Sequence, residues 1–154
     1  MAANEAKDVL LQAISGLLRG DGDMGEMERT LPLITDYVRY FAAPEFVCAM
    51  VPIPPTPAVE YPGVDGVADG WRDWGAAFES VRAEADTAYE SDDAVVLFVK
   101  QIAVTRHGGV EMTQPSAMLW LFEGGLVARL EFHLDRDAAF RAGGLDAADP
   151  GSPI

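Results

Sequence analysis

The sequence has few of the residues that form disulfides, metal sites or contacts to polyanions. Its 154 residues include one cysteine, Cys48, and two histidines, which excludes an internal disulfide and leaves no set with zinc-ligand spacing. Eleven basic residues against 25 acidic ones give a net charge of −14. This charge repels phosphate backbones and anionic lipid, so we expect neither nucleic acid nor a membrane as partner. Without a basic leader or a membrane-length apolar run, the expected location is cytoplasmic.

Apolar residues, by contrast, are abundant. They make up 49% of the chain, a composition typical of a globular protein. The length predicts a single domain, which we assign to residues 1–145, and the polar tail 146–154 (DAADPGSPI) is expected to be disordered. Cys48 lies in an apolar run and is expected to be a buried thiol.

Three helices are predicted in the first half of the chain from apolar residues at helical spacing. They are Asn4–Arg19, Thr30–Phe41 and Asp69–Val81. A strand is predicted over Glu45–Val51. Pro52–Pro62 contains five prolines and is predicted to be a loop.

The second half of the chain is predicted to form strands. The predicted strands are Arg82–Ser91, Ala94–Arg106, Val110–Phe122 and Leu126–Leu134, followed by a short helix, Arg136–Ala142. Paired glycines at 108–109 and 124–125 supply tight turns, and Pro115 favours an edge or a bend. Helices followed by antiparallel strands indicate an α+β fold, with three helices packed against a strongly curved sheet that encloses a cone.

Two segments carry a resemblance to a known family. The runs GVDGVADGWRDWGAAF (Gly63–Phe78) and LWLFEGGLVARLEFHLDRDAAFRAGGL (Leu119–Leu145) resemble SnoaL-like proteins of the nuclear-transport-factor-2-like superfamily. That superfamily includes ketosteroid isomerases, polyketide cyclases, epoxide hydrolases, dehydratases and non-catalytic binding domains. The resemblance implies a cone-shaped fold, a homodimer formed through the sheet, and a cofactor-free pocket for a small hydrophobic, oxygenated molecule.

Glu131 and His133 are the candidate catalytic pair. At positions i and i+2 of a strand they share a face, with Cβ atoms about 7 Å apart, so they could act as base and acid. Inside an apolar cone the pKa of Glu131 would rise, and Arg129 would hold its charge or bind an anionic ligand group. The alternative is that all three face solvent or a second subunit, while Leu130 and its neighbours line the interior. The sequence leaves this choice open.

Four aromatic residues are candidates for substrate binding, namely Trp71, Trp74, Trp120 and Tyr61. Each has a simpler interpretation as a packed core residue. Lys100 and Gln101 interrupt the most apolar strand, and Lys100 is expected to extend to an edge. Three functions remain open: a cofactor-free isomerase, cyclase or hydrolase, a non-catalytic binding or dimerisation module, and a structural protein whose cone is filled by its own side chains.

Overall fold

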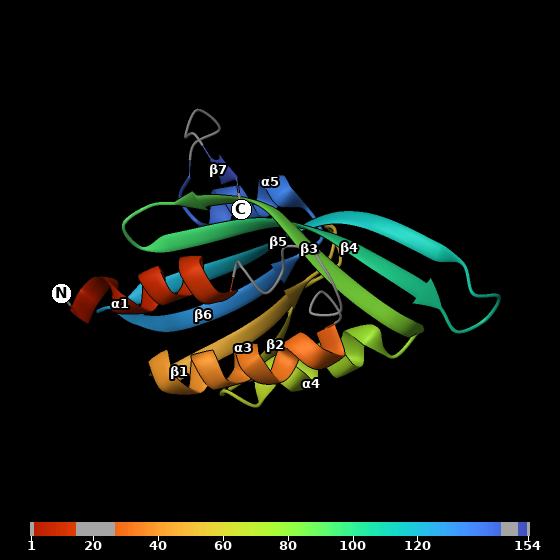
Figure 1. Cartoon of the computed structure of the whole chain (residues 1–154), viewed down its shortest axis with the longest axis horizontal. Coiled ribbons are helices and arrows are strands. Elements are labelled where there is room, and N and C mark those ends of the chain that lie inside the picture. Colours follow the sequence, from red (N-terminus) through yellow and green to blue (C-terminus); the bar gives the residue numbers. More distant parts are fainter. Residues whose placement is uncertain (1, 15–26, 146–150, 154) are drawn as a thin grey trace.

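The computed structural model describes residues 2–14, 27–145 and 151–153, and one curved sheet organises them (Figure 1). Its strands are β1 (Ala42–Val51), β2 (Val59–Pro62), β3 (Phe78–Glu90), β4 (Ala94–Thr105), β5 (Glu111–Glu123), β6 (Leu126–His133) and β7 (Ser152–Pro153). In space they run in the order β2-β1-β6-β5-β4-β3-β7. Neighbouring strands are antiparallel except β1 and β6, which are parallel.

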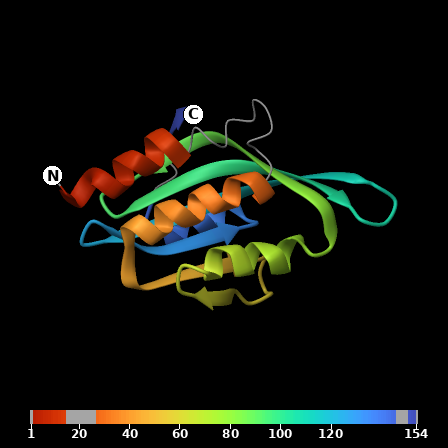
Figure 2. The same cartoon turned by 60° about the horizontal axis from the view of Figure 1, so that its bottom comes forward.

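Helices cover both faces of this sheet. The helices are α1 (Ala2–Val9), which continues as the π-helical turn η1 (Leu10–Ile14), then α3 (Met27–Phe41), α4 (Gly66–Gly75) and α5 (Arg136–Ala142). Figure 2 shows α1, α3 and α4 on one side of the sheet, whereas α5 lies on the other. This is the predicted α+β fold. None of the helices in the described residues is long and apolar enough to cross a membrane.

The main core lies between the sheet and the three helices α1, α3 and α4. Alternate strand residues such as Leu97, Trp120 and Leu130 are fully buried there against Leu10 and Ile34. The opposite parity forms a smaller cluster under α5, which includes Val96, Leu119 and Ala139. The sheet is therefore apolar on both faces along β4, as the sequence of that strand predicts.

The central hairpins form as predicted. Gly124 and Gly125 have φ values of 60° and 82°, which are the left-handed values that a two-residue hairpin turn requires. Pro115 lies in the part of β5 beyond the end of β6, where Ala117 is opposite His133, so it occupies an edge. Asp135 caps α5 by accepting a hydrogen bond from the backbone N–H of Asp137 at 3.0 Å.

Two local predictions are wrong. The third helix was predicted over Asp69–Val81, but α4 ends at Gly75 and β3 already begins at Phe78, where it pairs with Thr105. Sheet pairing thus overrides the helical spacing. The proline-rich loop contains β2, in which Val59 lies opposite Met50. A strand with Pro62 at its end is tolerated here because β2 is the edge of the sheet.

Both ends of the chain are described in part. The first helix was predicted to reach Arg19, and the structure describes it as far as Ile14, while 15–26 lie outside the described residues. Within the tail predicted to be disordered, Ser152 and Pro153 pair with Ala88 and Thr87 of β3. This differs from the expectation for these two residues, and 146–150 and 154 lie outside the described part.

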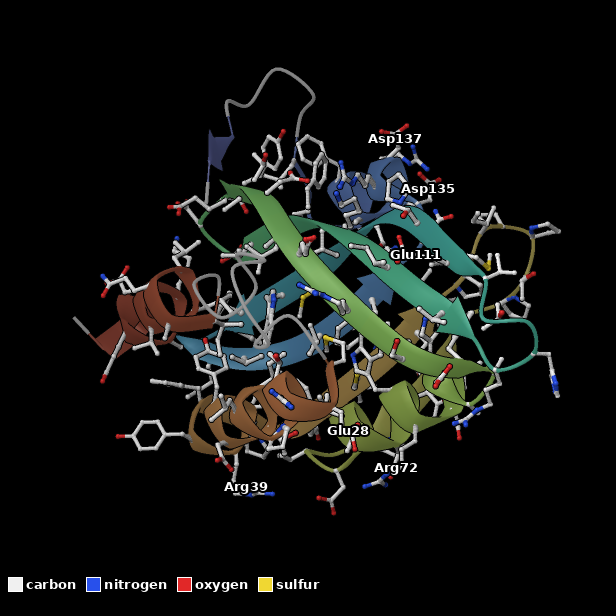
Figure 3. The ribbon with its side chains drawn as sticks, turned by 45° about the vertical axis from the view of Figure 1, so that its right-hand side comes forward. Glu28, Arg39, Arg72, Glu111, Asp135 and Asp137 are labelled. Carbon is white, nitrogen blue, oxygen red and sulfur yellow. The ribbon has the colours of Figure 1, made fainter. Side chains whose placement is uncertain are left out.

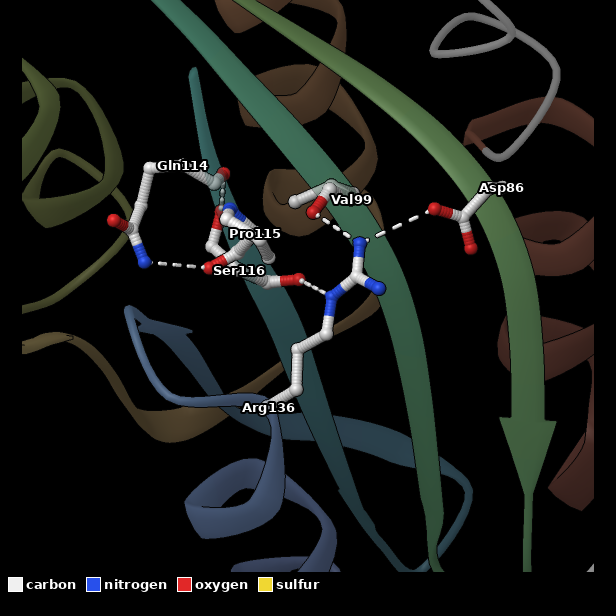
Figure 4. Close-up of polar contacts among 6 residues, drawn as sticks. All are labelled: Asp86, Val99, Gln114, Pro115, Ser116 and Arg136. Carbon is white, nitrogen blue, oxygen red and sulfur yellow. Dashed lines mark hydrogen bonds and ion pairs between the residues drawn. The ribbon is translucent and has the colours of Figure 1, made fainter. Parts of the chain in front are cut away.

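Arg136 fastens α5 to the sheet (Figure 4). The register of β3 skips Asp86, which is an extra residue there, and β6 ends opposite Ala117. At these two places the hydrogen-bond ladder of the sheet is incomplete. The carbonyl of Val99 instead accepts a hydrogen bond from Arg136 Nη2 at 2.8 Å, and the carbonyl of Ser116 accepts one from Arg136 Nε at 3.1 Å. Nη2 also lies 3.2 Å from Asp86 Oδ2, and the guanidinium stacks 4.7 Å from the centre of the Phe98 ring.

Candidate functional site

A groove of about 780 Å³ runs between α3, α4 and the start of β3. Its apolar lining is Met27, Leu31, Trp71, Phe78 and Val81. Charged residues including Glu28, Arg39 and Arg72 stand on α3 and α4 beside it (Figure 3). The volume lies within the range of about 300–1,000 Å³ that is usual for small-molecule sites.

The charged residues of the groove differ in how they are paired. Arg39 lies 3.1 Å from Asp36, and Arg72 lies 3.1 Å from Asp69, so two of the arginines have carboxylate partners. Arg106 instead donates from Nε to the backbone carbonyl of Ala76 at 3.0 Å. Within the described part of the chain, Arg106 has no ion pair, which leaves its remaining N–H groups available to an acceptor.

Trp71 belongs to both the groove and a small internal cavity. The cavity, of about 10 Å³, lies deeper in the cone and is lined by Met50, Trp71, Trp74, Gln101, Phe132 and Leu134. Trp74 Nε1 donates to Gln101 Oε1 at 3.2 Å. Trp71 Nε1 is buried and has no hydrogen-bond partner among the described residues. Polar groups of Trp71, Trp74 and Gln101 thus stand around this small space.

Glu131 and His133 share one face of β6, with His133 Nε2 at 2.7 Å from Glu131 Oε1. Arg129 donates from Nε to Glu131 Oε2 and lies 2.7 Å from Glu60 Oε2 through Nη1. Four charged or polar side chains therefore form one connected row, Glu60–Arg129–Glu131–His133, across β2 and β6.

The polar row lies on the α5 face of the sheet, away from α1, α3 and α4. Glu131 is opposite Leu119, a member of the cluster under α5, whereas Leu130 and Phe132 point to the main core. As in the second alternative, Leu130 lines the interior, but Glu131 and His133 are largely buried on the α5 face and do not face solvent. The placement of Glu131 and His133 inside the cone is therefore corrected, and a catalytic role for them stays a prediction.

The local electrostatics also differ from the expectation. Burial raises the pKa of Glu131, but hydrogen bonds and charges from His133 and Arg129 outweigh it, and the net effect is a pKa below the usual 4.5. Glu131 is thus held as a carboxylate. His133 is 4% exposed, and its Nδ1 has no hydrogen-bond partner among the described residues.

Comparison with known proteins identifies the fold. No family model and no curated protein matches the sequence. Solved structures do match. A candidate SnoaL-like polyketide cyclase from Jannaschia sp. CCS1 has a TM-score of 0.55 and 15% identity, covering 97% of this chain and 94% of its own. TerC, co-crystallised with polyporic acid, has a TM-score of 0.55 and 15% identity over 93% of this chain and 98% of its own.

A third match is a hypothetical protein with a ketosteroid isomerase-like fold from Catenulispora acidiphila, in complex with trimethylamine. Its TM-score is 0.51 at 15% identity, over 73% of this chain and 84% of its own. The chain has the nuclear-transport-factor-2-like fold of SnoaL-like proteins. The resemblance seen in the two sequence segments is thereby confirmed for the fold.

The other predicted binding residues occupy different places in this SnoaL-like fold. Trp71 reaches the groove and Trp74 reaches only the internal cavity. Trp120 is fully buried in the core, edge-on to Tyr37 with ring centres 5.6 Å apart. Tyr61 packs beneath α4 and donates its hydroxyl to Asp73 at 2.9 Å. Of these four aromatic residues, Trp71 and Trp74 thus line the groove or the internal cavity described above.

Sequence reasoning missed two polar residues of this region, Gln101 and Arg106. Gln101 shares the parity of Val95, Leu97 and Val99, which are all core residues, and this parity was a usable signal. Arg106 follows the end of β4, where no local pattern places it beside α4. Lys100, on the other parity, is exposed as expected. Among the described residues, no group of three histidine, cysteine or acidic side chains could hold a metal ion.

Proposed function

We propose that this protein binds a small, mainly apolar molecule that carries oxygen, in the groove between α3, α4 and β3. The observation that carries the proposal is the groove itself, with its volume of about 780 Å³ and the indole of Trp71 in its wall. Apolar side chains would bury the body of the ligand, and the unpaired N–H groups of Arg106 would donate hydrogen bonds to a carbonyl, hydroxyl or carboxylate oxygen at the rim.

Binding without catalysis is the form of this function that the geometry favours. The carboxylates that line the groove, Glu28, Asp36 and Glu79, are all exposed. The buried carboxylate–imidazole pair stands on the other face of the sheet. A general base must reach the proton that it removes, and Glu131 is separated from the groove by the sheet.

A homodimer formed through the sheet is part of the proposal. α5 covers only a portion of its face, and Val47, Leu121 and Arg129 are partly exposed beside it. A second copy placed there would bury this mixed apolar and charged surface. The mass in solution, measured by light scattering, distinguishes a dimer of about twice 16.5 kDa from a monomer.

The groove is tested by filling it. Ala76 and Ala77 are adjacent and exposed, but only Ala76 lines the groove. Ala76→Trp is expected to abolish binding of 1-tetralone, an apolar bicyclic ketone, in a calorimetric titration. Ala77→Trp is the matched control and should bind as the unchanged protein does. Equal binding by both variants, or none by the unchanged protein, would contradict the proposal.

A second candidate function is a cofactor-free isomerase, cyclase or hydrolase. The hydrogen-bonded pair Glu131–His133 and the polyketide-cyclase descriptions of the structural neighbours favour it. Proton transfer would then use Glu131 as base and His133 as its partner. In heavy water, such a protein would accelerate exchange of the acidic C2 protons of 1-tetralone, and Glu131→Gln would remove the acceleration. Exchange at the buffer rate with the unchanged protein counts against this candidate.

A further inference from the structure

We propose that Gln101 and Trp71 form a hydrogen-bond-donor subsite for a carbonyl oxygen of the bound molecule, at the inner side of the groove. The inference rests on the proposed binding function and makes its ligand class specific: an apolar molecule with a ketone, quinone or ester carbonyl. Both residues lie on the cone side of the sheet, and both line the internal cavity.

The orientation of the Gln101 amide is fixed by its neighbour. An indole N–H only donates, so Trp74 Nε1, at 3.2 Å, must face the amide oxygen rather than the amide nitrogen. The NH₂ group of Gln101 consequently points the other way. It has no hydrogen-bond partner within the described residues, although the side chain is 7% exposed. The amide nitrogen is not fully enclosed, so it remains accessible to an acceptor in the space beside it.

Trp71 provides a second donor at the same place. Its side chain is 6% exposed, and its Nε1 is buried without a partner in the described part of the chain. An unsatisfied buried donor is costly in a folded protein, so Trp71 Nε1, beside the accessible amide nitrogen of Gln101 in the lining of one cavity, indicates a function beyond packing. The side-chain groups without any partner here are donors, whereas Gln101 Oε1 already accepts a hydrogen bond from Trp74 Nε1. An oxygen that only accepts, such as a carbonyl, satisfies both donors, whereas a hydroxyl would bring a proton of its own.

The size of the cavity agrees with a single oxygen atom. Its volume of about 10 Å³ is close to the minimum that one water molecule needs. The body of the ligand must therefore lie in the larger groove. Trp71 lines both the groove and the internal cavity, so rotation of its side chain would connect them. Its ring would then lie against the apolar body of the ligand, with Nε1 near the carbonyl oxygen.

The test compares two probes that differ only in the carbonyl group, 1-tetralone and its parent hydrocarbon tetralin. Calorimetry should show the ketone binding roughly tenfold more tightly, which corresponds to about 1.4 kcal/mol. Gln101→Leu should lower the affinity for 1-tetralone to that for tetralin, and it should leave the affinity for tetralin unchanged. Lys100→Leu, on the adjacent exposed residue of the other face, is the control and should preserve the tenfold ratio.

Two further variants guard against a folding defect. Gln101→Glu keeps an acceptor for Trp74 and replaces the amide donor with a carboxylate oxygen. This variant should lower the affinity for 1-tetralone more than the affinity for tetralin. Trp71→Phe keeps an aromatic ring but removes the N–H, so it should lower the ratio of the affinity for 1-tetralone to the affinity for tetralin. Equal binding of both probes to the unchanged protein overturns the subsite and leaves the groove proposal standing. Binding of neither probe overturns both.

Discussion

Arg136 offers a prediction whose size follows from the structure. Replacing it with Met keeps most of the aliphatic stem and removes the hydrogen bonds to Val99 O and Ser116 O, the ion pair with Asp86 and the contact with Phe98. Hydrogen bonds from a charged donor contribute about 1.5–3 kcal/mol each. The Asp86 carboxylate is 53% exposed, so that ion pair adds well under about 1 kcal/mol.

Water can partly replace the lost donors because the Arg136 side chain is 28% exposed. We therefore expect Arg136→Met to lower the free energy of unfolding by about 3 kcal/mol, near the lower end of the sum. For a chain of this length, that corresponds to a fall in Tm of roughly 6–12 °C. The measurement is thermal and urea unfolding followed by circular dichroism.

The matched control for this prediction is Arg141→Met, an exposed arginine on the same helix. It should change stability by less than about 0.5 kcal/mol. Arg136→Lys keeps the charge, but one ammonium group cannot reach both carbonyls. Its loss of unfolding free energy should therefore lie between those of Arg141→Met and Arg136→Met. If Arg136→Met is no less stable than Arg141→Met, the assignment of Arg136 as the fastener of α5 is refuted.

Three other outcomes follow from the described contacts. Because the pKa of Glu131 is lowered, its carboxylate stabilises the fold at pH values above the usual pKa of 4.5, and this stabilisation is lost as the pH falls through the lowered pKa. The difference in Tm between the unchanged protein and Glu131→Gln should therefore shrink in acid. A difference that stays constant with pH would contradict this prediction. Burial raises the pKa of Cys48 to about 12, so a disulfide reagent should react only upon unfolding; rapid reaction of the native thiol would count against its burial. A Cβ on Gly66 would lie 2.2 Å from the carbonyl oxygen of Tyr61, whereas one on Gly75 meets nothing within 4 Å. Gly66→Ala should therefore cost more than about 2 kcal/mol in urea unfolding and Gly75→Ala should be neutral or stabilising, and similar values for both would disprove the close approach.

Local signals made much of this fold predictable. The apolar run of β4, the alternation in β6, the paired glycines and the Asp135 cap each act within a few residues, so these elements and α5 appear where predicted. Elements that depend on distant pairing were harder to foresee. The strand β2 exists because β1 is beside it, and β3 begins at Phe78 because β4 pairs with it.

The face on which Glu131 lies depends on similar long-range information. The register between β5 and β6 skips Ala128, so Val127 joins Leu130 in the main core, although the sequence places them on opposite parities. Such a bulge gives no recognisable signal in the local sequence. Arg106 is likewise brought to the groove by the pairing of Phe78 with Thr105 and by its hydrogen bond to the carbonyl of Ala76. The core parity of Gln101, in contrast, was visible along its strand.

The central claim is that ligand binds on the cone side of the sheet and not at the Glu131–His133 pair. An NMR titration of the ¹⁵N-labelled protein with 1-tetralone tests it most directly, because the three tryptophans give three indole signals that Trp→Phe variants assign. We predict saturable shifts of the Trp71 indole and of groove amides such as that of Phe78. Shifts concentrated at Arg129, Glu131 and His133, with the Trp71 indole unmoved, would contradict the account.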